Sequence, residues 1–173
     1  MQEQSRQAPS PARLAELLLG WYTPELRDLP WRGLSDPWAV WVSESMLQQT
    51  RASVVRQRFP SFLRAFPTPA ALAAATDDQL LPAWQGLGDY RRARQLREAA
   101  AAVAERHGGR IPEDPDDFLR LPGVGLYTRG AVYSIAFGLP LPALDGNVER
   151  VAGRMLALER SEERRVGKEW RAR

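Results

Sequence analysis

The stretch LPGVGLYTRG, residues 121–130, decides the fold because it joins two helical patterns through a glycine-containing turn. Short helices are predicted over 115–120 and about 126–137. Glycines at 123 and 125 allow positive φ and let the backbone approach a partner closely. The turn and the first N–H groups of the second helix therefore form a pocket of main-chain amides that suits one phosphate. Such a contact reads a nucleic-acid backbone rather than its sequence; a turn that merely joins two helices is the alternative.

The rest of the chain shows helical periodicity, without an alternating strand pattern or an internal repeat. Ser35 or Asp36 can cap one helix, Asp77 can cap another, and Gly108 and Gly109 close a long one. The sequence therefore predicts an all-α protein of about eight to ten helices with short loops. The other expected helical segments are 11–27, 37–50, 52–66, 68–76, 77–84, 91–107 and 144–158.

Composition excludes several classes of protein. The 173 residues hold no cysteine, which rules out disulfides and cysteine-ligated zinc or iron–sulfur clusters in this sequence. No apolar run approaches the length of about 18 residues that spans a membrane, and MQEQSRQAPS at 1–10 lacks the apolar core of a signal peptide. We therefore expect a cytoplasmic protein with no membrane partner. The net charge of +3 gives only weak support for nucleic-acid binding.

Four motifs follow one another along the chain: WVSESMLQQT at 41–50, AWQGLGDY at 83–90, LPGVGLYTRGAV at 121–132 and LDGNVERV at 144–151. Together they closely resemble the adenine DNA glycosylases, the MutY family of the helix–hairpin–helix glycosylase superfamily, over residues 29–158. The resemblance implies the helix–hairpin–helix DNA glycosylase fold, with a helical bundle lobe and the remnant of a second helical lobe. It further implies a monomeric base-excision-repair enzyme of the bacterial cytoplasm, associated with the nucleoid. Its substrate would be double-stranded DNA with adenine mispaired with 8-oxoguanine or guanine.

Removing a base requires an acid that protonates the leaving base and an anion that stabilises the sugar cation. Glu44 lies among apolar residues inside a predicted helix, and such surroundings raise the pKa of a carboxyl. Asp145 stands at a predicted helix start, where backbone N–H groups keep a carboxylate ionised. The resemblance assigns Glu44 as the general acid and Asp145 as the catalytic anion, with Asn147 orienting the site. A solvated glutamate and a plain helix cap are the alternatives.

Tyr127 separates two kinds of chemistry within the superfamily. Relatives resembling endonuclease III carry a lysine at this position, which forms a Schiff base and cuts the strand. This chain has tyrosine there, and its only lysine is Lys168. We therefore expect a monofunctional glycosylase that leaves an abasic site, in which Tyr127 supports Asp145 and the sugar by hydrogen bonding. An ordinary aromatic residue at a helix start is the alternative.

The resemblance also places the DNA contacts. Gln49 is expected to wedge into the space that the flipped adenine leaves. Trp31 and Arg32 are expected to line the adenine pocket, although Trp31 can equally be a core aromatic. The residues expected to contact DNA are Gln48, Gln49, Thr50, Leu87, Gly88, Tyr90, Arg91, Leu121, Gly123, Val124, Gly125 and Thr128. No metal-ligand set is expected, and the superfamily implies only a sodium or potassium ion as a candidate at the hairpin.

The turn GLGDY at 86–90 departs from the family, which has tyrosine at position 89. That tyrosine wedges beside 8-oxoguanine, whereas Asp89 cannot stack and brings negative charge close to phosphates. We expect altered lesion recognition unless Leu87 or Tyr90 compensates. The arginines that either face the DNA backbone or form a solvated helix face are Arg91, Arg92 and Arg94.

A second departure concerns regions that the family has in addition. Its four cysteines that hold a [4Fe–4S] cluster, and its C-terminal domain that reads 8-oxoguanine, have no counterpart in these 173 residues. We therefore expect a chain truncated before those regions, with no cofactor. The predicted parts are an N-terminal helix of the second lobe at 1–28, the helical lobe at 29–138 with the helix–hairpin–helix at 115–137, the catalytic-aspartate helix at 139–160, and an atypical, non-native tail at 161–173.

Two alternatives to an adenine glycosylase stay open. A thymine glycosylase acting on G·T mismatches shares the hairpin, the tyrosine and the aspartate, although Glu44 within SESMLQQT favours adenine. A DNA-binding fragment would keep the hairpin and the wedge but lack catalysis.

Overall fold

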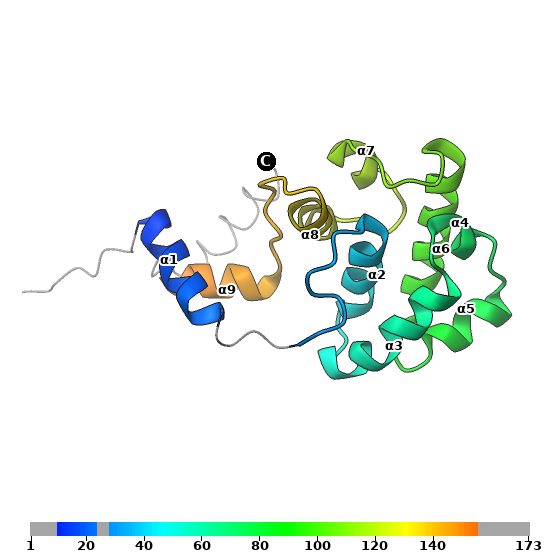
Figure 1. Ribbon diagram of the computed structural model, residues 1–173, viewed down its shortest axis with the longest axis horizontal. Helices are drawn as coiled ribbons and strands as arrows, with labels where there is room; N and C mark the ends of the chain where they lie inside the picture. The colour runs from blue at the N-terminus through cyan, green and yellow to red at the C-terminus, as the bar shows by residue number, and fades with distance from the viewer. Residues whose placement is uncertain (1–9, 24–27, 156–173) are drawn as a thin grey trace, which may run out of the picture. The chain divides into compact units, whose positions relative to one another are not determined.

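The computed structural model describes residues 10–23 and 28–155, and all of its regular elements in these ranges are helices (Figure 1). The all-α prediction is therefore confirmed. The chain divides into two compact units, residues 29–144 and the two ends of the chain, 1–28 and 145–173. Within the described ranges, no helix has the length and apolar content needed to cross a membrane.

The unit of residues 29–144 is a helical bundle built around α2. Its elements are α2 (Pro37–Leu47), α3 (Ala52–Ala65), α4 (Pro69–Ala73), α5 (Asp77–Trp84), α6 (Tyr90–Arg106), α7 (Pro115–Leu119) and α8 (Leu126–Ala136). α2 lies in the middle, where α3, α6 and α8 all contact it (Figure 1). Every residue from Trp38 to Met46 is buried, because a helix that is apolar nearly all round must be covered on all sides. The one charged side chain within that buried run is Glu44.

Two helix ends follow the sequence predictions. The carboxylate of Asp36 accepts a hydrogen bond from the backbone N–H of Trp38 at 3.1 Å, which starts α2. At the end of α6, Gly108 and Gly109 adopt positive φ angles of 59° and 77°, a conformation that glycine reaches without steric cost. These caps set the start of α2 and the end of α6.

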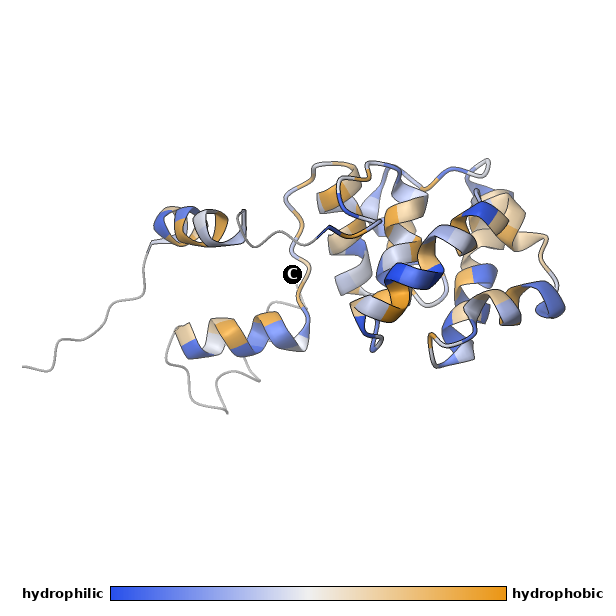
Figure 2. Ribbon diagram, turned by 60° about the horizontal axis from the view of Figure 1, so that its bottom comes forward, coloured by the Kyte–Doolittle hydropathy of each residue, from blue (hydrophilic) through white to orange (hydrophobic). Residues whose placement is uncertain are grey.

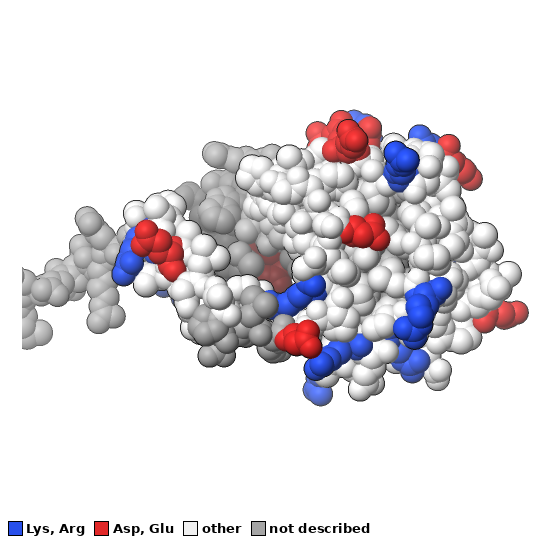
Figure 3. All heavy atoms as spheres, in the orientation of Figure 1, with Lys and Arg blue, Asp and Glu red and all other residues white. Residues whose placement is uncertain are grey.

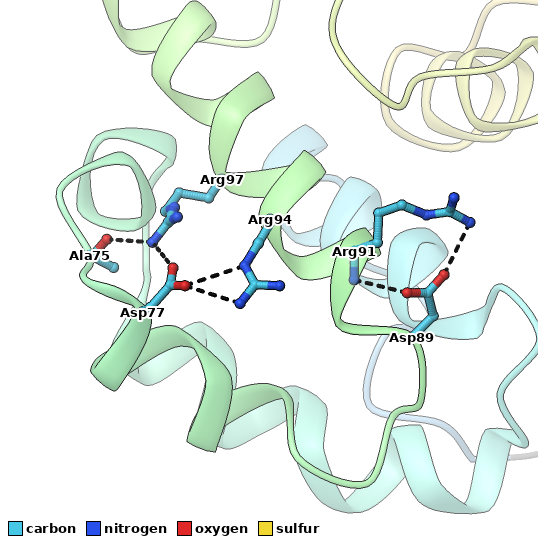
Figure 4. A network of polar contacts seen from close by, with 6 residues as sticks. All are labelled: Ala75, Asp77, Asp89, Arg91, Arg94 and Arg97. Atoms are coloured by element: carbon cyan, nitrogen blue, oxygen red, sulfur yellow. Dashed lines mark hydrogen bonds and ion pairs between the residues drawn. The ribbon is translucent and has the colours of Figure 1, made fainter.

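The start of α5 differs from its prediction. The N-cap is Thr76 rather than Asp77, because the side chain of Gln79 accepts a hydrogen bond from the Thr76 N–H at 3.0 Å. Asp77 is the first residue of the helix, and its carboxylate pairs with Arg94 at 3.1 Å and with Arg97 at 2.7 Å (Figure 4). Asp77 therefore links α5 to α6 through ion pairs and does not cap α5.

The other unit contributes α1 (Pro11–Tyr22) and α9 (Gly146–Met155). Apolar residues recur along both helices (Figure 2), and Trp21 and Val151 are 65% and 53% exposed. The helices predicted over 11–27 and 144–158 run past α1 and α9 into residues that lie outside the described ranges. The tail predicted at 161–173 also lies outside them.

Candidate active site and DNA interface

Glu44 lies in α2 with 8% of its surface exposed. Burial removes water from its carboxyl and raises the pKa above the ordinary value of 4.5, as the sequence predicted. The hydroxyl of Tyr127 donates to Oε2 at 2.9 Å, and this hydrogen bond lowers the pKa in part. A carboxyl in this setting keeps its proton to higher pH than a surface glutamate does, which is what a general acid requires.

Tyr127 stands in the first turn of α8, which packs against α2. The sequence indicated Asp145 as the residue that Tyr127 supports. The structure shows a hydrogen bond from Tyr127 to Glu44, a residue 83 positions away in the sequence. The tyrosine hydroxyl therefore orients the proposed acid, a role that the motifs did not reveal.

Asp145 begins the second segment of the other unit and caps α9. Its Oδ1 accepts hydrogen bonds from the backbone N–H groups of Val148 at 2.8 Å and of Asn147 at 2.9 Å. Its Oδ2 accepts from the side-chain amide of Asn147 at 2.9 Å. The hydrogen bond from Val148 and those from Asn147 hold the pKa of the carboxyl below its ordinary value of 3.8. The predicted cap is confirmed.

Asn147 connects this carboxylate to a positive charge. Its side-chain oxygen accepts a hydrogen bond from the guanidinium of Arg150 while its amide N–H donates to Asp145. The charge of Arg150 further lowers the pKa of Asp145. This geometry fits the orienting role predicted for Asn147, because the amide holds the carboxylate in one rotamer.

Of the two glycines in the hairpin between α7 and α8, only Gly123 adopts a positive φ, whereas Gly125 is extended with a φ of −108°. Gly123 adopts a φ of +71°, and the N–H of Val124 bonds back to the carbonyl of Leu121 at 3.2 Å. A side chain at Gly123 would also crowd Gln95 of α6, whose Cβ would lie 3.0 Å from the new Cβ. Gly125 caps α8, whose first N–H groups face away from the helix body. The hairpin thus offers main-chain donors, as expected of a phosphate site.

Two residues predicted to contact DNA at the hairpin have buried side chains. Leu121 is 5% exposed and Thr128 is 3% exposed. The Thr128 hydroxyl accepts a hydrogen bond from the side-chain amide of Gln48 at 3.4 Å, which ties α8 to the loop after α2. Any contact of Leu121 or Thr128 with DNA therefore goes through the backbone.

The loop that follows α2 presents Gln49 to the solvent. Among the described residues, Gln49 is the only non-glycine residue with a positive φ, 57°. Such a conformation costs about 1 kcal/mol or more and is concentrated at functional sites. Its neighbours are held from within: Gln48 bonds to Thr128, and the Thr50 hydroxyl donates to the carbonyl of Leu87 at 2.7 Å. The wedge predicted at Gln49 therefore projects from a loop that is fixed on both sides.

Arg92 fixes this loop, contrary to both roles that the sequence suggested for it. Its guanidinium donates to the carbonyl of Ser45 at 2.8 Å, to Leu87 O at 2.6 Å and to the Thr50 hydroxyl at 3.2 Å. It also lies over the ring of Trp84, 5.6 Å from the centroid. Arg92 therefore faces the protein interior and joins the end of α2 to the turn before α6, instead of facing DNA or the solvent.

Of the side chains in the turn at 86–90 that were predicted to contact DNA, one is exposed and one is buried. Gly86 and Gly88 have positive φ angles of 86° and 91°, and Tyr90 is 41% exposed. Leu87 is 2% exposed, so its side chain belongs to the core and has no surface with which to stack on a base. Asp89 caps α6 by accepting a hydrogen bond from the Arg91 N–H at 2.9 Å. Of the residues proposed to replace the missing tyrosine, only Tyr90 has the exposure to do so.

The arginines that follow this turn are paired within the protein. The guanidinium of Arg91 lies 3.3 Å from the carboxylate of Asp89, and that of Arg94 lies 3.1 Å from Asp77 (Figure 4). Both arginines are more than half exposed, so water screens these ion pairs and a phosphate can compete for them. The structure therefore keeps Arg91 available as a predicted DNA contact.

The two residues predicted for the adenine pocket are half-buried. Trp31 packs edge-on against Phe59 at a centroid distance of 5.9 Å and lies against the core. The alternative of a core aromatic thus accounts for part of its surface. Arg32 donates its backbone N–H to the carbonyl of Leu29 at 2.9 Å, within the turn that leads to α2.

One arginine beside this surface was missed by the sequence analysis. Arg58 on α3 lies next to the turn at 86–90, because its guanidinium would be 3.8 Å from a Cβ built on Gly86. Figure 3 shows arginines gathered over α3, while acidic side chains gather over α7. The arginine spacing in RASVVRQRF could have revealed this basic helix face.

The family follows from a match that covers most of the chain. The protein-family model described as "HhH-GPD superfamily base excision DNA repair protein" matches residues 42–172. The chain belongs to the HhH-GPD superfamily. The helix–hairpin–helix fold expected from the motifs is confirmed with it.

Similar proteins place the chain more finely. It is 46% identical over 139 residues to an adenine DNA glycosylase of Mycobacterium tuberculosis, with 79% of this chain and 45% of the relative covered. A thermostable thymine-DNA glycosylase structure superposes with a TM-score of 0.78 at 30% identity, covering 82% of this chain and 66% of that one. A trapped endonuclease III–DNA covalent intermediate gives a TM-score of 0.69 at 26% identity, covering 82% and 63%. The chain spans less than half the length of the M. tuberculosis relative.

Proposed function

We propose that this chain is the catalytic part of a DNA glycosylase that flips a base out of duplex DNA and hydrolyses its N-glycosidic bond. The proposed substrate is adenine opposite 8-oxoguanine or guanine, as in the adenine DNA glycosylases that the chain resembles. The observation that carries the proposal is a pair of carboxyls in opposite settings. Glu44 is buried with a hydrogen bond from Tyr127, whereas Asp145 accepts hydrogen bonds from two backbone N–H groups and one side-chain amide, so their pKa values shift in opposite directions. A pair of this kind supplies both an acid and an anion at one pH.

The acid step belongs to Glu44. Burial favours the protonated form of its carboxyl, and Tyr127 fixes the position of Oε2. The bond between the sugar C1′ and the base nitrogen breaks, and its electron pair leaves with the base. The proton from Glu44 neutralises the departing adenine at N7. Glu44 is then a carboxylate and accepts a proton from the water that attacks C1′, which restores the acid.

The anion step belongs to Asp145. Positive charge develops on the sugar as the bond breaks, and a fixed carboxylate stabilises it. The hydrogen bonds from Asn147 and Val148 keep Asp145 ionised and in one orientation. No further reorganisation of the carboxylate is then needed when the charge appears.

The chemistry ends at the abasic site. A Schiff-base lyase of this superfamily uses a lysine at the position of Tyr127, and a phenol cannot form an imine with the sugar. The proposed enzyme is therefore monofunctional, and strand scission requires a separate alkaline step.

The test is single-turnover release of the base from defined duplexes, each read with and without alkali. We expect cleavage of A·8-oxoguanine and A·G duplexes after alkali and none without it. Scission without alkali would contradict the monofunctional chemistry. Tight binding without base release would instead favour a DNA-binding fragment.

A G·T-specific thymine glycosylase is the second candidate, because a thymine-DNA glycosylase structure matches with a TM-score of 0.78. The same assay decides between the two. Faster release of thymine from a G·T duplex than of adenine from an A·8-oxoguanine duplex would favour the second candidate.

A further inference from the structure

The segment that leaves α8 turns back along that helix before it reaches Asp145. Gly138, with a φ of +67°, reverses the chain, and the N–H of Leu139 bonds to the carbonyl of Tyr133 at 3.0 Å. Residues 139–144, which we call the strap, then pass Gly130, nearer the start of α8. The half-buried side chain of Leu141 packs against the core and holds the strap in place.

Gly130 is the point where the strap touches the helix backbone. A Cβ built on Gly130 would lie 2.0 Å from the carbonyl oxygen of Pro142, 2.6 Å from its carbonyl carbon and 3.0 Å from the N of Ala143. Carbon–oxygen contacts of this kind settle at about 3.3 to 3.6 Å. The atoms in the way belong to the backbone, so no side chain can rotate aside. Any residue larger than glycine would push the strap outward by more than about 1 Å.

The strap is built to pass such a shift along the chain. Pro140 and Pro142 each have a fixed φ, and each restricts the residue before it. Such a segment has few free torsions with which to absorb a displacement. Only Ala143 and Leu144 separate Pro142 from Asp145, the residue that caps α9.

We propose that Gly130 is a positioning residue for catalysis: the close contact of its backbone with Pro142 sets the place from which the chain delivers Asp145. This inference rests on the proposed function, in which Asp145 must stabilise the sugar cation. α8 then carries two supports of the site, Tyr127, which orients Glu44, and Gly130, which seats the strap. The two supports lie three residues apart, on neighbouring turns of one helix surface.

The first experiment compares Gly130→Ala with Gly20→Ala. Gly20 is the matched control, because a Cβ there meets no atom of the described residues within 4 Å. We expect Gly130→Ala to lower the single-turnover rate by about 100-fold, since a displacement of about 1 Å at a catalytic group has a cost of that order. DNA binding should stay within about threefold, and Gly20→Ala should keep the wild-type rate. A wild-type rate for Gly130→Ala would overturn the proposal.

The pH–rate profile separates positioning from damage to the acid. In Gly130→Ala, the limb that reports Glu44 should stay at the wild-type pH while the plateau falls, because the Tyr127–Glu44 hydrogen bond is untouched. A shifted limb would mean that the substitution disturbs α8 itself, and it would overturn the proposal. Pro142→Gly covers the case in which Gly130→Ala fails to fold. It loosens the strap without overpacking and should lower the rate by about tenfold; an unchanged rate would refute the role of the strap.

A readout without DNA keeps this proposal separate from the proposed function. The amide NMR signals of Asn147 and Val148 report the cap that Asp145 makes. They should move in Gly130→Ala and stay in place in Gly20→Ala. Inactivity of the wild type on every duplex would contradict the proposed function, whereas unmoved amide signals in Gly130→Ala would contradict the inference about Gly130.

Discussion

The middle of α2 and the start of α9 each hold one carboxyl of the proposed site, and the two places treat a carboxyl in opposite ways. Inside α2 the backbone N–H groups are used by the helix itself, so buried Glu44 has lost water, and its hydrogen bond comes from the side chain of Tyr127. At the start of α9 the N–H groups have no helical partner, and Asp145 accepts two of them. The position in the helix, more than the residue type, therefore decides which group keeps its proton.

The largest expected effect comes from removing the buried acid. Glu44→Gln keeps the size and the hydrogen-bond acceptor for Tyr127 but cannot donate an acidic proton. We expect the single-turnover rate of base release to fall by about 1,000-fold, with DNA binding nearly unchanged. Glu98→Gln, on the exposed face of α6, is the control and should keep the wild-type rate. A Glu44→Gln variant with near-normal activity would contradict the assignment of Glu44 as the acid.

The next effect tests the anion at the start of α9. Asp145→Asn keeps a good helix cap but removes the charge. We expect the rate to fall by about 100-fold to 1,000-fold, with little change in the midpoint of thermal unfolding. The matched control is Asp114→Asn, because Asp114 caps α7 in the same way by accepting the Asp116 N–H at 2.8 Å. Equal losses in both variants would show that the caps matter only for folding.

A smaller effect tests the hydrogen bond from Tyr127 to Glu44 of α2. Tyr127→Phe removes the hydrogen bond that lowers the pKa of Glu44, so this pKa should rise further. An acid acts while it is protonated, and the alkaline limb of the pH–rate profile should therefore move to higher pH. The maximal rate should fall by about tenfold, the equivalent of one hydrogen bond. Movement of the limb to lower pH would contradict the predicted role of the tyrosine.

The smallest effect is on stability. The pKa of Glu44 is raised by folding, so its favourable contribution is complete below pH 4.5 and is lost as the pH rises through the folded-state value. Glu44→Gln removes this loss. The variant should have a higher free energy of unfolding than the wild type at pH 8, and lose that advantage at pH 4. Urea unfolding of both proteins at the two pH values measures this difference in free energy of unfolding. A Glu44→Gln variant less stable than the wild type at pH 8 would contradict the claim that burying the ionised Glu44 carboxylate destabilises the fold.

Local patterns made the cap at Asp145 and the burial of Glu44 predictable. The aspartate stands two residues before an asparagine at a helix start, and the glutamate has apolar neighbours on both sides. Both properties depend on residues within one turn of helix. The all-α fold followed in the same way, from periodicity within each segment.

The contacts that hold the site together were not predictable, because they join distant positions. Tyr127 and Glu44 are 83 residues apart, and Arg92 and Ser45 are 47 apart. No periodicity in one sequence links such positions, so Arg92 was expected to face outward. Leu87 was misjudged for a related reason: its turn suggested exposure, while its side chain is 2% exposed within the core and Arg92 bonds to its carbonyl.

The most direct measurement is the titration of the two carboxyls by carbon-detected NMR, with Glu44→Gln and Asp145→Asn to assign the signals. The account predicts that Glu44 titrates above 4.5 and Asp145 below 3.8. Both groups titrating at ordinary values, or Asp145 titrating above Glu44, would contradict it.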